Sequence, residues 1–190
     1  MKHIRLLGLL VLTVMALPAQ AAVFNTVQLD KSRLGFTFKE MGVAIKGGFS
    51  RFNAQLNFDP AKPTAASAVI DVDLASVDAG SPDANDEVAG KLWFDTKAFP
   101  HARFVSSAVH ALGGNRYEAI GTLTIKGRSR TIAAPFTYVG QGATARFDGG
   151  FTLKRADFAI GEGEWADFST VANEVQVAFQ IQAGQSAARK

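Results

Sequence analysis

Apolar and polar residues alternate along most of this chain. In one segment, Leu34, Phe36 and Phe38 are separated by the small or polar residues Gly35 and Thr37. The same period of two recurs over residues 52–58, 68–74, 117–125, 132–138, 145–153 and 175–181. Successive side chains of a β-strand point to opposite faces, so each run predicts a strand with one apolar and one solvated face.

Turn residues separate these runs. Short glycine-containing segments at 113–115, 126–129 and 140–142 predict hairpins between neighbouring strands. Eight or nine short strands joined by hairpins predict an all-β fold, a single antiparallel β-barrel whose closure removes exposed edges. One short helix is expected after Ser81-Pro82-Asp83, with Val88, Leu92 and Trp93 on its apolar side.

The N-terminus has the pattern of an export signal. Lys2 and Arg5 precede an apolar run over residues 6–17, and Ala19 and Ala21 provide small residues for cleavage. We therefore expect a signal peptide over residues 1–21, a single domain over 22–190 and a periplasmic location. A membrane anchor is the alternative, although the apolar run is short for the roughly 20 residues that a span needs.

Composition excludes several classes of function. The chain has no Cys, which removes thiol catalysis and Cys-ligated metals, and only His101 and His110 follow the signal peptide. No run of Lys or Arg marks a nucleic-acid surface. We therefore expect no catalytic residue, no metal and no cofactor. Asp71 and Asp73 are assigned to a solvated face, and Arg155 and Asp157 are expected to form a structural ion pair.

Four groups of motifs connect the chain with a known family. They are residues 38–43 with 47–52 and 58–60, residues 92–95 with 99–107, residues 121–127, and residues 154–161. In this order and spacing, the chain from about residue 29 to residue 183 resembles the YceI-like family of periplasmic lipid-binding proteins. Many members carry His where this chain has Lys31 and Glu40, so no head-group contact of those histidines is carried over.

The resemblance implies a lipocalin-like barrel with a long apolar tunnel. Family members are associated with polyisoprenoids, including isoprenoid quinones. Some are encoded or fused with cytochrome-b-type membrane modules, and others are induced by base or osmotic stress. The resemblance therefore implies that residues 22–190 form a YceI-like lipid-binding β-barrel domain.

The apolar faces of the expected strands supply the candidate ligand site. An ordinary filled core is the alternative, but Gly121 and Gly149 fall on the same faces, where small residues leave room for a ligand or another backbone. The candidate tunnel residues are Phe36, Phe38, Phe52, Leu56, Ile70, Phe104, Phe136, Phe147, Phe151 and Phe179.

These observations favour a non-catalytic carrier for a long-chain isoprenoid lipid of the polyprenyl or isoprenoid quinone type. The alternative is an accessory subunit that docks on a membrane cytochrome-b-type redox or stress-response partner, with side chains filling the tunnel. An isomerase or hydrolase on a lipocalin scaffold is a third hypothesis. The sequence leaves open whether the chain forms a homodimer.

Overall fold

The computed structural model describes residues 22–186, so the expected signal peptide lies outside the described residues. These residues form one α-helix and eleven strands, nine of which have six or more residues. No described helix is long and apolar enough to cross a membrane. The elements are β1 (Phe24–Val27), β2 (Arg33–Glu40), β3 (Val43–Phe49), β4 (Phe52–Asn57), β5 (Ser67–Asp73), β6 (Val77–Asp78), α1 (Pro82–Ala89), β7 (His101–Gly113), β8 (Arg116–Ile125), β9 (Arg128–Gln141), β10 (Thr144–Lys154) and β11 (Glu174–Gln185).

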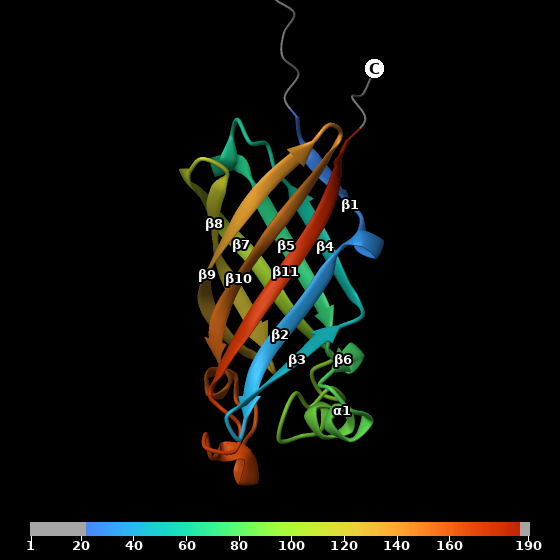
Figure 1. Cartoon of the computed structure of the whole chain (residues 1–190), viewed down its shortest axis with the longest axis vertical. Coiled ribbons are helices and arrows are strands. Elements are labelled where there is room, and N and C mark those ends of the chain that lie inside the picture. The colour runs from blue at the N-terminus through green and yellow to red at the C-terminus, as the bar shows by residue number, and fades with distance from the viewer. Residues whose placement is uncertain (1–21, 187–190) are drawn as a thin grey trace, which may run out of the picture.

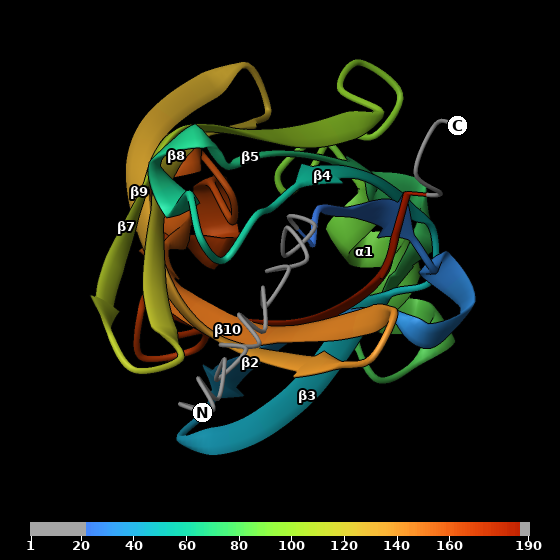
Figure 2. The same cartoon turned by 90° about the horizontal axis from the view of Figure 1, so that it is seen from above.

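The strands form one antiparallel sheet that curls into a barrel (Figures 1 and 2). Neighbours along it follow the order β4-β5-β7-β8-β9-β10-β11-β2-β3-β6, and β1 also pairs with β11. Phe24 in β1 and Phe58 after β4 donate backbone hydrogen bonds to each other's carbonyls, at 2.9 and 3.1 Å. The expected all-β antiparallel barrel with one short helix is confirmed. The long strands match the expected eight or nine, and β1 and β6 add two short ones.

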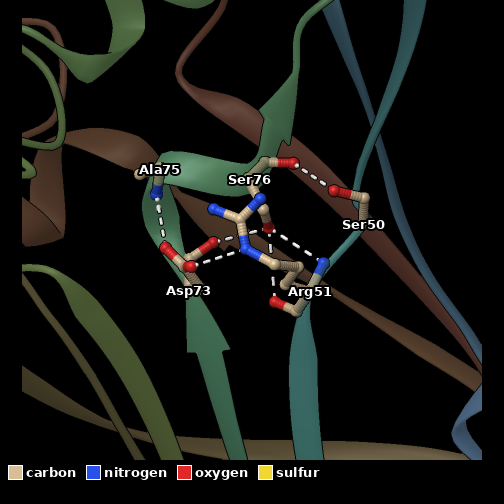
Figure 3. Close-up of polar contacts among 5 residues, drawn as sticks. All are labelled: Ser50, Arg51, Asp73, Ala75 and Ser76. Carbon is tan, nitrogen blue, oxygen red and sulfur yellow. Dashed lines mark hydrogen bonds and ion pairs between the residues drawn. The ribbon is translucent and has the colours of Figure 1, made fainter.

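A network of hydrogen bonds connects the β3–β4 corner with the end of β5 (Figure 3). Ser76 Oγ accepts from the Arg51 backbone N–H at 3.0 Å and donates to the Asp73 carbonyl at 2.7 Å. Arg51 Nε donates to Asp73 Oδ2 at 2.8 Å, and this hydrogen bond holds the pKa of the Asp73 carboxyl below its usual value. These hydrogen bonds thus fix the place where the chain leaves β3 and enters β4, which lies at the other end of the strand order.

Helix α1 begins where the sequence indicates and ends earlier than expected. Ser81 Oγ accepts the Ala84 backbone N–H, and Pro82 occupies the first turn, as in many helix N-termini. The helix stops at Ala89, so the expectation that Leu92 and Trp93 lie on its apolar side is wrong. Both residues follow in a series of turns.

Two packed clusters fill the ends of the barrel. At the end that carries β1, Phe58 is 1% exposed, and its ring centroid lies 5.1 Å from those of both Tyr117 and Phe147. At the other end, which carries α1, Trp93 and Phe158 are buried in a second cluster. We call these the β1 end and the α1 end; the cavity described below lies along the barrel interior.

The inner-face glycines were expected to leave room either for a ligand or for another backbone, and the structure shows close packing against the neighbouring strands. A Cβ atom on Gly149 would lie 2.5 Å from the ring of Phe179 and 2.5 Å from the Pro135 carbonyl oxygen. A Cβ on Gly121 would meet the ring of Phe104 at 2.6 Å. These glycines allow a phenylalanine ring and a backbone carbonyl of the neighbouring strands to approach closely.

Candidate functional site: an apolar cavity

The barrel encloses a cavity of about 260 Å³ with an almost entirely apolar wall. This volume is close to the lower end of the range for small-molecule pockets, roughly 300–1,000 Å³. All ten residues that the sequence assigns to a tunnel lie on this wall: Phe36, Phe38, Phe52, Leu56, Ile70, Phe104, Phe136, Phe147, Phe151 and Phe179. Their contact with a ligand stays a prediction.

The exposure of these side chains shows that the interior is not uniformly packed. Nine of the ten are only half-buried although they line the inside of the barrel. Phe147 differs, because it is 4% exposed and packs against Phe58 in the cluster at the β1 end. That cluster closes the interior at the β1 end, so the tunnel that the resemblance implies does not continue through this end of the barrel.

Sequence reasoning missed several wall residues. Leu34 and Val177 line the cavity and share the alternation of their strands with the predicted tunnel residues, so the period of two contains the signal for them. Val88, Trp93 and Phe94 come from α1 and the turns after it. No periodicity places those three on the wall, because only the folding of this segment across the α1 end brings them there.

Arg155 is the one charged side chain that is fully buried among the described residues, at 1% exposure. Its guanidinium donates five hydrogen bonds to backbone carbonyls, at 2.6–3.2 Å. The expected ion pair between Arg155 and Asp157 is wrong, because all five hydrogen bonds of the guanidinium go to backbone carbonyl oxygens. Burial lowers the pKa of Arg155, and the carbonyls compensate the charge. The acceptors belong to Ile160, Gly161, Trp165, Val171 and Ala172.

Few polar groups are available on the wall. Among the lining side chains, only those of Ser67, Trp93, Arg103 and Arg155 carry polar atoms. All five hydrogen bonds of the Arg155 guanidinium go to backbone carbonyls. Arg103 forms an ion pair with Asp71 at 2.7 Å. The buried indole N–H of Trp93 has no hydrogen-bond partner among the described residues, and buried indoles usually find one. It is therefore a donor that the fold itself does not use.

The remaining candidate polar residues lie away from the cavity wall. Asp71 and Asp73 form ion pairs with Arg103 and Arg51 and remain partly exposed, as expected for a solvated face. Lys31 and Glu40 do not line the cavity. Within residues 22–186, no three His, Cys, Asp or Glu side chains are grouped as metal ligands would be.

The fold and the cavity define an antiparallel β-barrel with a hydrophobic interior site. The chain belongs to the YceI-like domain family, whose model matches residues 26–183. A UPF0312 protein of Pseudomonas putida strain W619 is 30% identical over 152 residues, which cover 77% of this chain and 76% of the relative.

Solved structures share the fold. BcnA of Burkholderia cenocepacia is 48% identical, with a TM-score of 0.81 over 83% of this chain and 99% of BcnA. A polyisoprenoid binding domain from Saccharophagus degradans, implicated in plant cell wall breakdown, is 18% identical, with a TM-score of 0.65 over 88% of this chain and 100% of the domain. At that identity, the second likeness is one of fold alone.

Proposed function

We propose that this chain carries a long-chain isoprenoid lipid, of the polyprenyl or isoprenoid quinone type, and catalyses no reaction of its own. The observation that carries the proposal is the cavity, with its wall of half-buried aromatic and aliphatic side chains. A filled core would bury those rings, whereas a binding site keeps part of their surface available. The fold shared with a domain named for polyisoprenoid binding supports the same conclusion.

The chemistry of the wall favours a ligand that is apolar along its length. Burial of ten methylene equivalents contributes about 8 kcal/mol by transfer bookkeeping, which is close to the ~8.2 kcal/mol of a micromolar complex. Ordering of a flexible chain opposes part of this. The Trp93 N–H is itself buried, so the wall presents almost no polar surface to a head group. A weakly polar head group such as a hydroxyl, phenol or carbonyl suits this wall better than a diphosphate, for which the wall offers no free cation.

The periplasm is the proposed location. It rests on the basic residues, the apolar run and the small residues of positions 1–21, which lie outside the described residues. An apolar, water-insoluble cargo is compatible with transport across that aqueous compartment, since a free prenyl chain would expose its surface to water.

A cavity-filling variant and an uptake assay test this function. Ala68 lines the cavity and is half-buried, so Ala68→Phe places a ring in the cavity space. We expect the wild type to bind a fluorescent prenyl analogue at micromolar concentration or below, with unlabelled polyprenols as competitors. Ala68→Phe is expected to weaken binding roughly tenfold, or about 1.4 kcal/mol, with little loss of stability.

The control is Ala178→Phe, which adds the same ring to an exposed position of β11 outside the cavity wall. It should bind the analogue as the wild type does. Absence of uptake by the wild type, or equal weakening by both variants, would contradict the carrier function.

A further inference from the structure

The β2–β3 hairpin ends in a turn that presents a methionine to solvent. Met41 and Gly42 form the two-residue turn, and their φ angles of 48° and 81° are both in the left-handed region. Such turns favour Asn-Gly, because Asn tolerates this backbone and other non-glycine residues adopt it rarely. Met41 is 79% exposed, the largest value among the exposed large hydrophobic residues of the described chain. The turn geometry therefore does not explain why a methionine occupies this position.

A second apolar side chain lies beside this turn. Val43 follows in β3 and is 65% exposed. Phe168, on the segment after β10, is 48% exposed, but its ring packs 5.1 Å from Cζ of the buried Arg155. This segment is fastened to the hairpin, because the Met41 backbone N–H donates to the Thr170 carbonyl at 2.8 Å. Hairpin and segment both lie at the α1 end of the barrel (Figure 1). We call Met41 and Val43 the apolar tip.

The apolar tip adjoins the cavity wall. Phe38 lines the cavity three residues before Met41 in the sequence, and Val171, which pairs with Glu40, lines it as well. The opposite end is closed by the aromatic cluster around Phe58. A molecule that contacted the tip would therefore lie next to the end of the barrel where α1 and its turns cover the cavity.

The charges around the tip are mixed. Lys39 and Lys46 on the hairpin are exposed, but the acidic Glu40 directly precedes Met41. Attraction to an anionic partner is thus weak. A contact that the tip makes with another surface would therefore depend on the insertion of its apolar side chains. Separate protruding side chains suit a fluid interface, where each can enter between lipid chains.

We infer that the apolar tip inserts into the surface of a lipid bilayer and holds the α1 end of the barrel against it. This inference rests on the proposed function, because a carrier of a membrane lipid must reach the bilayer that contains it. The bound surface is the lipid itself, so zwitterionic phosphatidylcholine vesicles are sufficient for binding.

Vesicle flotation with the mature chain tests the inference. Met41→Asn/Val43→Thr removes both hairpin side chains, while Asn-Gly suits the turn and Thr suits the strand. We expect wild-type protein to float with phosphatidylcholine vesicles and this variant to lose roughly tenfold or more in partitioning. Its urea midpoint should not fall. The control is Val105→Thr/Leu112→Asn on β7, where the two residues are 40% and 47% exposed, and it should float as the wild type does.

Three outcomes would overturn the inference. The first is equal flotation of the tip variant and the wild type. The second is binding that requires anionic lipid and disappears at about 0.5 M salt, where charges are screened. The third is a wild-type protein that forms a dimer but does not bind vesicles, together with a tip variant that is monomeric. This result would assign the tip to contact with a second copy of the chain.

Polyprenol uptake in the absence of vesicles separates this inference from the proposed function. A tip variant that takes up polyprenol as the wild type does, while only the wild type floats, supports both statements. Uptake without wild-type flotation overturns the tip alone. Flotation through the tip without any uptake overturns the carrier function and leaves the membrane contact in place.

Discussion

Arg155→Met should destabilise the protein by about 3–5 kcal/mol, the range for removing one partner of a buried charged network. The substitution keeps the apolar stem of the side chain but leaves five backbone carbonyls without their donor. Each unpaired buried carbonyl costs about 1–3 kcal/mol before the segment relaxes. Urea unfolding followed by tryptophan fluorescence measures the change, because Trp93 packs under the guanidinium with its ring centroid 5.5 Å from Arg155 Cζ.

Arg146→Met is the matched control. Arg146 is half-exposed and pairs with Asp148 at the surface, so its loss should cost less than about 1 kcal/mol. Hydrogen exchange gives a second measure, since Arg155→Met should speed exchange over residues 160–172 more than in the β-ladder. Equal destabilisation by the two variants would show that the carbonyl network does not hold the α1 end together.

Phe147→Ala and Phe151→Ala should differ in stability although both residues lie on β10 and line the cavity. Phe147 packs against Phe58 and Tyr138, with ring centroids 5.1 and 5.6 Å away, so its truncation leaves an unfilled hole. We expect a cost of about 3–5 kcal/mol for Phe147→Ala. Phe151 is half-buried beside open space, and its loss in the ligand-free protein should cost less than half as much.

For binding, the larger loss should occur at Phe151 and the smaller one at Phe147. Phe151→Ala removes surface that a ligand would cover, so its affinity for a prenyl analogue should fall while the protein stays folded. Urea midpoints and analogue titrations give both quantities. If the two variants lose the same stability in the absence of ligand, the interior is packed throughout and the cavity does not exist in solution.

For the strands with an alternating run, the sequence is sufficient to predict which face points inward. The period of two depends only on the alternating direction of side chains, so it places Phe36, Phe151 and Phe179 on the inward face. Alternation cannot show how far an inward side chain lies from the opposite wall. The packed state of Phe147 and the free space beside Phe151 therefore required the structure.

Contacts between strands and loops explain the predictions that were wrong or left open. Gly149 is covered by Phe179 on the neighbouring strand β11, and strand order is not visible in local alternation. Arg155 suggested a pair with Asp157 because the two are close in sequence. Its actual partners are backbone carbonyls of an irregular segment. Every residue has a backbone carbonyl, so the residue types do not indicate which carbonyls accept these hydrogen bonds.

Native mass spectrometry of the periplasmic fraction, purified without detergent, tests the central claim most directly. The account predicts a chain that begins at Ala22 and carries the mass of one prenyl lipid, which organic extraction then releases. A chain without any lipid that also takes up no polyprenol when it is supplied would contradict the account.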